Sequence, residues 1–355
     1  MPETDIQPNN ENNYLKKFNS LLSNPKLSST YKLFFIKSLL DLAYYSDKHK
    51  DTIIGHQWIR EEENRLKVDL NFIAIRFIRY YANLYFKFRL KQSHNPKDAN
   101  INTILDKYKN EISLRIQTFK SSKEFLKSLA ENNFNSLRKE VIQKSIKREV
   151  LFHLDKEKYL YERHKNYILI DYSLIHFFKD YKVIVSAGVN YILTRYLEKI
   201  NNIVPRIAEK ISEDSKRTQL NQKEKNILLQ KNDGCFYCKE EYSRYHMEHV
   251  IPFNFVYDTK LFNIVPACSD CNSKKGDKLP TQNILEEVKS RNKNLKILGD
   301  FYTDEWYQEL YDSCRISYHG DRAFFYILKK NNLSTNIGDG HESHSRLYKF
   351  SSYFL

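Results

Sequence analysis

The chain contains 355 residues, of which 41% are hydrophobic and 29% are charged, and this composition excludes an intrinsically disordered protein. Lysine and arginine outnumber aspartate and glutamate by 58 to 44, and the resulting net charge of +14 favours a polyanion as the partner. Only 8 glycines and 8 prolines occur, so the sequence favours long helices over a turn-rich β fold.

The sequence predicts a protein without a membrane segment. No window reaches about 18 uninterrupted apolar residues, and residues 1–13 lack the apolar stretch of a signal peptide. Four of the five cysteines form two Cys-x-x-Cys pairs, and Cys314 stands apart from them. This pattern fits one metal site in a reducing compartment better than a disulfide framework. We therefore expect a cytoplasmic protein.

Residues 1–228 predict a mostly helical region. Apolar residues recur at helical spacing over residues 31–43 and again over 68–90. The second pattern carries several cationic positions, which either form a solvated stripe on a core helix or make a DNA-binding face: Arg76, Arg79, Lys87 and Arg89. Three further helices are expected over residues 101–118, 122–149 and 172–200.

One strand and one linker complete this region. The short β-branched run over residues 167–171 predicts a strand. The polar run over residues 212–225 predicts a linker. Its cations either face solvent or bind phosphate: Lys216, Arg217, Lys223 and Lys225. Beyond the linker, helices are expected over residues 284–292, capped by Thr281, and over 304–312, before a polar tail that contains His341 and His344.

Two Cys-x-x-Cys pairs predict a metal centre. Cys235 pairs with Cys238 and Cys268 with Cys271, and 29 residues separate the inner two. Each pair offers two thiolates to one tetrahedral ion, and two pairs complete a four-cysteine site. Zinc suits soft sulfur ligands in this arrangement. The intervening segment is long enough to carry chemistry of its own.

That segment resembles the HNH, or ββα-metal, endonuclease family, in the subset with a four-cysteine zinc site. The resemblance covers about residues 229–292 and rests on three motifs that occur in order: His246-Met-Glu-His-Val-Ile-Pro252, Asn263-Ile-Val-Pro266 and Cys271-Asn-Ser-Lys-Lys-Gly276. One residue departs from the family pattern, because Glu248 stands where the family usually has aspartate.

The resemblance implies a catalytic role for four residues. His249 would be the general base that activates water, and Asn263 would fix the loop around it by hydrogen bonds. Glu248 and Asn272 would hold a catalytic Mg²⁺. Because glutamate is one methylene longer than aspartate, Mn²⁺ is an alternative ion. His246 lies two residues before Glu248 and therefore on the same strand face, where it is either a further metal ligand, a phosphate contact or a surface residue.

Four cations lie near these residues in the sequence and are expected to contact DNA phosphates: Arg244, Lys274, Lys275 and Lys278. Hydrolysis in the family leaves 5′-phosphate and 3′-hydroxyl ends. Since one such site cuts one strand at a time, a homodimer would account for double-strand breaks.

The predicted fold class is mainly α with a small α+β module. A helical region over residues 1–228 would recognise the target or regulate the enzyme, the zinc-clamped module would span 229–292, and a helical extension would span 293–355. The expected function is that of a DNA endonuclease, either a type II restriction-like deoxyribonuclease or another antiviral defence enzyme. Two alternatives stay open: a non-catalytic zinc-organised DNA-binding module, and a subunit that is active only with a defence-system partner protein.

Overall fold

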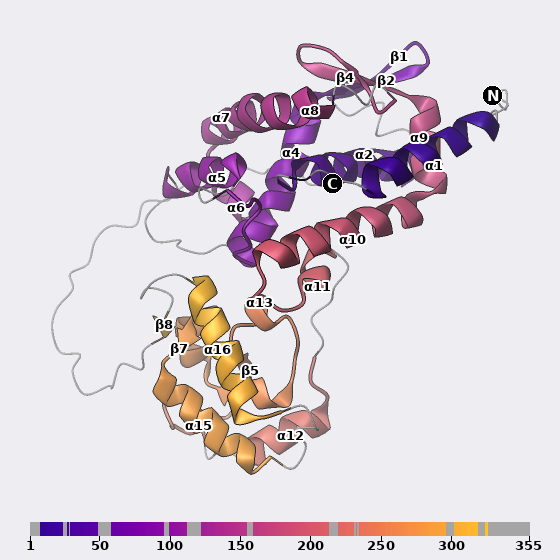
Figure 1. Cartoon of the computed structure of the whole chain (residues 1–355). Helices are drawn as coiled ribbons and strands as arrows, with labels where there is room; N and C mark the ends of the chain where they lie inside the picture. The colour runs from indigo at the N-terminus through magenta and orange to yellow at the C-terminus, as the bar shows by residue number, and fades with distance from the viewer. Residues whose placement is uncertain are drawn as a thin grey trace. The chain divides into compact units, whose positions relative to one another are not determined.

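The computed structural model describes residues 8–23, 27, 29–48, 58–95, 99–111, 122–154, 159–212, 219–230, 232, 234–295, 302–318 and 324–325. The chain divides into two compact units, residues 1–216 and 217–355. Helices dominate both units and small sheets accompany them, which confirms the predicted fold class (Figure 1). Within the described residues, no helix combines the length and the apolar character needed to cross a bilayer.

The amino-terminal unit consists of helices around a short sheet. Its helical elements are α1 (Pro8–Ser23), α2 (Tyr31–Lys48), α4 (Leu70–Ala82), η1 (Asn83–Lys87), α5 (Asn100–Glu111), α6 (Ser122–Ser128), α7 (Glu131–Val141), η2 (Ile142–Leu151), α8 (Phe152–Leu154), α9 (Tyr172–Asp180), α10 (Lys182–Ile200) and α11 (Ile207–Ile211). Its strands are β1 (Ile59–Glu62), β2 (Arg65–Asp69), β3 (Glu162–Arg163) and β4 (Tyr167–Asp171).

Helices α2 and α4 form the centre of this unit. Phe34 of α2 packs edge-on against Tyr81 of α4, with ring centroids 4.8 Å apart, and the Tyr81 hydroxyl lies 2.7 Å from the buried Thr30 hydroxyl. Arg76 of α4 is also buried and lies 3.6 Å from Asp41 of α2. The predicted solvated stripe is therefore wrong at Arg76, and α4 is a core helix.

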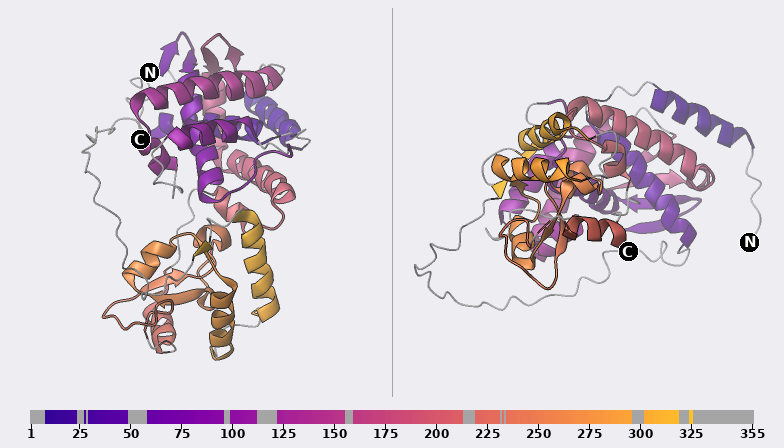
Figure 2. Two further views of the ribbon diagram at one scale, coloured as in Figure 1. Left: turned by 90° about the vertical axis from the view of Figure 1, so that its left-hand side faces the viewer. Right: turned by 90° about the horizontal axis from the view of Figure 1, so that it is seen from below.

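The predicted strand over residues 167–171 is confirmed as β4, and three strands around it were not predicted. The sheet has the order β1-β2-β4-β3 with antiparallel pairs, and Leu66 lies opposite Ile170. Figures 1 and 2 place these strands at one end of the helices of the unit. The missed strands are two to five residues long and rich in charge, so they lack an extended apolar pattern.

Three predicted helices differ from the observed ones. The helix expected from residue 68 begins at Leu70, because residues 65–69 form β2 and the Asp69 carboxylate caps the helix by accepting the Asn71 N–H at 2.8 Å. The helix expected over 122–149 breaks at Leu129 and Ala130, where Ala130 is extended. The helix expected over 172–200 breaks at Tyr181.

The carboxy-terminal unit contains α12 (Gln222–Gln230), β5 (His246–His249), α13 (Phe253–Val256), η3 (Leu261–Asn263), β6 (Ile264–Ala267), α14 (Ser269–Lys275), β7 (Leu279–Pro280), α15 (Gln282–Lys293), α16 (Asp304–Tyr318) and β8 (Phe324–Phe325). Helices α15 and α16 confirm the two helices predicted after the cysteine segment, and Thr281 occupies the predicted cap position.

Helix α12 corrects the predicted linker. Lys223 and Lys225 lie on this helix, which a reciprocal capping box begins: the Asn221 side chain accepts the Glu224 N–H at 2.9 Å, and the Glu224 carboxylate accepts the Asn221 N–H at 2.8 Å. Lys216, Arg217, His341 and His344 lie outside the described residues.

Candidate metal centre and active site

The candidate site is built on two antiparallel strands and the helix that follows them. Strand β5 pairs with β6, so that Glu248 lies opposite Val265 and His249 opposite Ile264. Helix α14 begins directly after β6, with Cys268 as its N-cap residue. The segment thus has the ββα order that the sequence resemblance implied.

The four cysteines come together at one end of this ββα segment. Cys235 and Cys238 lie in a turn that is held to β6 because the Phe236 N–H donates to the Pro266 carbonyl at 2.8 Å. Gly234 begins this turn with a φ of +122°, and a Cβ there would stand 2.8 Å from the Glu240 carbonyl oxygen. Only glycine therefore fits this turn without strain.

The cysteine cluster fits a structural zinc ion. Its four sulfur atoms all lie within 4.8 Å of one another, and the sulfurs of Cys238 and Cys268 are 3.9 Å apart. Tetrahedral zinc with Zn–S bonds of about 2.3 Å requires sulfur–sulfur separations of about 3.8 Å. The N–H of Cys268 donates to the Cys235 sulfur at 3.3 Å, and the N–H of Cys271 to the Cys268 sulfur at 3.4 Å, so backbone dipoles already favour thiolates.

The cluster also needs a cation for electrostatic reasons. Burial raises the pKa of the Cys271 thiol, and the neighbouring cysteine sulfurs raise it further. Burial likewise raises the pKa of Cys238, whereas at Cys268 the effect of burial is outweighed by hydrogen bonds, the Cys271 N–H first among them, which lower the pKa. Because four thiolates repel one another in this space, a divalent cation is what allows them to be deprotonated together.

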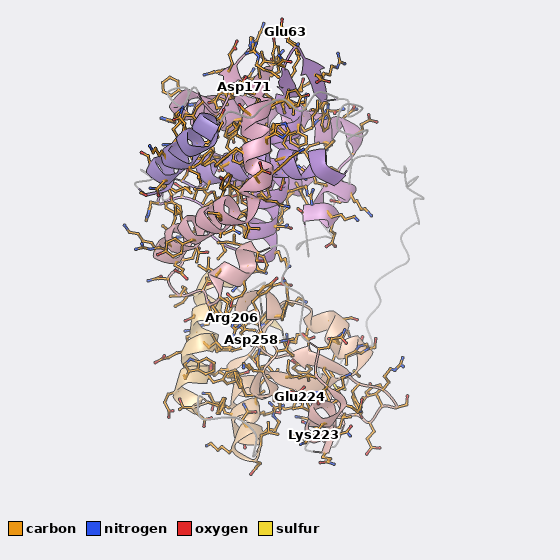
Figure 3. All side chains as sticks on the ribbon, turned by 90° about the vertical axis from the view of Figure 1, so that its right-hand side faces the viewer. Glu63, Asp171, Arg206, Lys223, Glu224 and Asp258 are labelled. Carbon is orange, nitrogen blue, oxygen red and sulfur yellow. The ribbon has the colours of Figure 1, made fainter. Side chains whose placement is uncertain are left out.

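His249 ends strand β5 and is buried, with 2% of its surface exposed. Its Nε2 lies 2.9 Å from the backbone oxygen of Asp258, which is labelled in Figure 3. A carbonyl oxygen accepts hydrogen bonds only, so Nε2 carries the ring proton and the lone pair of the neutral imidazole lies on Nδ1. The ring also packs against Phe253, with centroids 5.2 Å apart. The imidazole therefore has a fixed orientation and a defined basic nitrogen.

Asn263 binds the loop that follows His249. Its side chain is fully buried, and its amide Nδ2 donates to the Ile251 carbonyl at 2.9 Å while its Oδ1 accepts the Ile251 N–H at 2.8 Å. Its backbone oxygen accepts the Val250 N–H at 2.9 Å. One residue thus satisfies both sides of the turn at Val250 and Ile251, which is the arrangement that the expected role of Asn263 requires.

Replacing Asn263 by alanine should destabilise the carboxy-terminal unit. The change leaves the N–H and the carbonyl of Ile251 without their amide partner in a buried turn, at a cost of about 1–3 kcal/mol for each group. We expect a loss of about 3 kcal/mol or more in the free energy of urea unfolding. Asn226→Ala, at an exposed position on α12, is the matched control and should change it by less than about 0.5 kcal/mol. Equal unfolding midpoints for the two variants would contradict this assignment.

Helices α15 and α16 hold the segment that contains Asn263 by hydrogen bonds, which the sequence did not predict. The buried Arg291 donates to the backbone oxygens of Phe262 and Ile264, at 3.0 and 2.5 Å. Burial lowers the pKa of Arg291 to about 10. From α16, the Tyr307 hydroxyl donates to Asn263 Oδ1 at 2.7 Å. A usable signal was present, because Arg291 continues the apolar helical spacing of Leu285 and Val288 and therefore falls on the buried face of α15.

Tyr307 makes the stability of this unit sensitive to alkali. Burial raises the pKa of Tyr307 well above the ordinary value near 10. In the unfolded chain the phenol ionises near pH 10, whereas the folded chain keeps it protonated, so its contribution is complete below pH 10 and is lost as the pH rises above 10. We expect the unfolding free energy to fall between pH 10 and 11.5, and to fall less steeply in Tyr307→Phe. Parallel slopes in the two proteins would contradict this effect.

Glu248 lies on β5 and Asn272 on α14, and Lys275 joins these two elements. Lys275 of α14 donates from its ammonium to Glu248 Oε1 of β5 at 3.0 Å. Asn272 precedes Lys275 by three residues and therefore lies on the same face of α14. The two predicted oxygen ligands thus lie on neighbouring elements.

The structure separates the predicted cationic residues into two groups. Arg244, Lys274 and Lys278 are exposed, and Lys274 pairs with Asp270 at 2.8 Å on the surface of α14. Lys275 departs from the expected phosphate contacts, because its side chain is fully buried and pairs with Glu248. His246 is exposed at the first position of β5.

The family model of the HNH endonuclease matches residues 235–278. These residues include both cysteine pairs, strands β5 and β6 and helix α14, so the segment matches the HNH endonuclease family and carries a four-cysteine cluster that can hold a zinc ion. Comparison of the chain with curated proteins and with solved structures gives no match.

Proposed function

Because residues 235–278 match the HNH endonuclease family, we propose that the protein is a metal-dependent deoxyribonuclease in which His249 is the general base. The observation that carries this proposal is the fixed tautomer of His249, which the hydrogen bond to the Asp258 carbonyl sets. His249 lies on β5, the strand that also bears Glu248. A buried imidazole with its lone pair on Nδ1 is suited to accept a proton from water near neutral pH.

Each residue then has one task in hydrolysis. Nδ1 of His249 takes the proton as the water oxygen bonds to phosphorus. The bond from phosphorus to the 3′ oxygen breaks, and that oxygen takes a proton from solvent water, which leaves 5′-phosphate and 3′-hydroxyl ends. Glu248 and Asn272 would hold Mg²⁺, an ion that prefers oxygen ligands. When bound, its positive charge would stabilise the negative charge of the phosphate and of the leaving oxygen. Asn263 keeps the His249 loop in place.

Three exposed cations are suited to the DNA backbone. Arg244 precedes β5, Lys274 lies in the last turn of α14 and Lys278 lies three residues after that helix ends. Contacts of this kind position the duplex without reading its sequence. A net charge of +14 adds a general attraction to DNA that weakens with salt.

The proposed biological role is restriction or another form of antiviral defence. Its support is the separate amino-terminal unit, residues 1–216, which has its own apolar core and is large enough to recognise a target or sense a partner. Two copies, each cutting one strand, would make a double-strand break. Sedimentation of the protein on DNA should then show a dimer, and a monomer that still breaks both strands would exclude this arrangement.

One observation favours a second candidate function. Glu248 already pairs with Lys275, so its carboxylate has a cation beside it before any metal arrives. In a zinc-organised DNA-binding module without catalysis, this ion pair would be sufficient to neutralise Glu248, and no catalytic metal would be needed. Such a module would bind DNA equally well with and without Mg²⁺, and His249→Ala would leave its binding unchanged.

Incubation of supercoiled plasmid with zinc-loaded protein and either Mg²⁺ or Mn²⁺ separates these functions. The proposed nuclease produces nicked and linear plasmid that disappears when the added ion is omitted. Discrete fragments would indicate sequence-specific restriction, and a smear would indicate a non-specific effector. Intact plasmid that is nevertheless bound would support the binding module. Cleavage that appears only with a co-purified protein would identify a partner-activated subunit.

A further inference from the structure

Lys275 is the one residue of the predicted phosphate-binding set that lies inside the domain. Its side chain has no exposed surface, and its ammonium donates to Glu248 Oε1 at 3.0 Å and approaches the Gly276 carbonyl at 3.4 Å. The Glu248 side chain is 14% exposed. A buried ammonium is stable only when it is paired and hydrogen-bonded, so this contact is a built part of the domain and not a surface ion pair.

We propose that Lys275 is a positioning residue that sets the metal affinity of the Glu248 site and makes it depend on DNA. This inference rests on the proposed function, in which Glu248 and Asn272 hold a divalent ion. Lys275 engages Oε1 of the carboxylate, which leaves Oε2 as the oxygen for the ion. The ammonium also balances the single negative charge of the two proposed ligands, since Asn272 is neutral.

The affinity of an oxygen site for a divalent ion rises with the negative charge of its ligands. With Lys275 in contact, the Glu248 carboxylate offers little net charge, and the ammonium repels the incoming ion. A DNA phosphate beside Glu248 would supply the missing negative charge. The free protein would therefore bind the ion weakly, and the complex with DNA would bind it tightly.

The pair also gives a physical account of the glutamate at position 248. A glutamate carboxylate on β5 lies one methylene farther from the backbone than an aspartate carboxylate, a difference of about 1.5 Å. That length lets Oε1 reach an ammonium that the following helix holds in the interior. Lys275 thus fixes a side chain that would otherwise have more conformational freedom than the usual aspartate.

Titration of Mn²⁺ into the zinc-loaded full chain without DNA, with free Mn²⁺ measured by electron paramagnetic resonance, tests this inference. Lys275→Gln keeps a hydrogen-bond donor and removes the charge, so it should bind Mn²⁺ at least tenfold more tightly than wild type. Lys275→Arg keeps the charge, so a Lys275→Arg protein that retains zinc should stay within about twofold of wild type. The matched control is Lys293→Gln on α15, an exposed lysine that pairs with Asp304, which should also stay within twofold. Adding Glu248→Gln to Lys275→Gln should abolish the gain.

A purely structural role for Lys275 predicts a different result, because a damaged fold weakens zinc retention, thermal stability and Mn²⁺ binding together. Unchanged or weaker Mn²⁺ binding by a Lys275→Gln protein that retains zinc and unfolds at the wild-type temperature would overturn the inference.

If Lys275→Gln does not fold, the comparison moves to the His249→Ala protein, which keeps Lys275 and Glu248. A short DNA duplex should tighten its Mn²⁺ affinity at least tenfold, and equal affinities with and without the duplex would overturn the inference. Neither measurement involves turnover. If the wild type cleaves no DNA but these changes in Mn²⁺ affinity are observed, the proposed nuclease activity is wrong and the role of Lys275 is retained. If the wild type cleaves DNA and Mn²⁺ affinity does not change, the nuclease activity is retained and the role of Lys275 is wrong.

Discussion

Replacing Cys268 by serine is expected to remove the zinc ion and to unfold the HNH domain. The Cys268 sulfur lies 3.9 Å from the Cys238 sulfur, accepts the Cys271 N–H and caps helix α14. Structural zinc contributes about 10–16 kcal/mol to the folding of small zinc domains. A whole domain is usually stable by only about 5–15 kcal/mol. Loss of the ion therefore exceeds what the remaining contacts can supply.

The matched segment is short, since it spans only residues 235–278, and a segment of this size depends strongly on a bound metal for its stability. Ile264 of β6 joins it to its neighbours through a buried cluster with Leu228 of α12, Leu220 and Leu295. Metal analysis should show about one zinc ion per chain in the wild type and almost none in Cys268→Ser. Limited proteolysis should cut the variant within residues 234–295 under conditions that leave the wild type whole.

Cys314 provides a matched control for the Cys268 variant. It is fully buried in α16 but lies outside the sulfur cluster. Cys314→Ser should cost about 1 kcal/mol of stability through the buried hydroxyl and should keep the zinc content of the wild type. A Cys268→Ser protein that retains zinc and resists protease as well as Cys314→Ser does would show that the cysteine cluster is not a structural metal site.

His249→Ala is expected to lower the single-turnover rate of DNA cleavage by about 10²–10⁴-fold, the usual contribution of a general base. The fold should survive, because the hydrogen bonds between Asn263 and Ile251 do not involve the imidazole. DNA binding should also survive, because the exposed cations Arg244, Lys274 and Lys278 are unchanged. The variant should therefore bind DNA and retain zinc while it loses the chemical step.

His246 is the control for this substitution, because it lies two residues earlier on β5 and is exposed. We expect His246→Ala to change the rate by less than about fivefold. A cleavage rate for His249→Ala within tenfold of the wild-type rate would show that His249 is not the general base. An equally large loss in His246→Ala would instead make His246 a metal ligand.

The candidate site could be located in the sequence because the spacing of its residues is local. The two cysteine pairs, His249 and Asn263 could be read from short motifs, and the sulfur cluster follows because each Cys-x-x-Cys pair is a single turn of chain. The ββα order also followed from the sequence, through the resemblance to a family with a fixed arrangement of these motifs.

The supporting contacts could not be read from the sequence, because they join residues that are far apart. Arg291 reaches the backbone of Phe262 and Ile264 across 27 to 29 positions, and Tyr307 reaches Asn263 across 44. Lys275 looked like one of several surface cations in a basic run, and only the packing of α14 against β5 reveals that it is buried. Short strands that are rich in charged residues, such as β1, could not be predicted for a similar reason. They lack an apolar pattern, and the register of the sheet depends on partner strands elsewhere in the chain.

Cleavage of DNA in water enriched in ¹⁸O is the most direct test of whether this domain hydrolyses phosphodiester bonds with His249 as the base. Zinc-loaded wild type and His249→Ala would be incubated with duplex DNA and Mg²⁺, and the cleaved ends analysed by mass spectrometry. We predict that the wild type places one ¹⁸O atom on each new 5′-phosphate and that His249→Ala yields almost no labelled ends. Cleavage without ¹⁸O at the 5′-phosphate, or equal labelling by the two proteins, would contradict the proposed reaction.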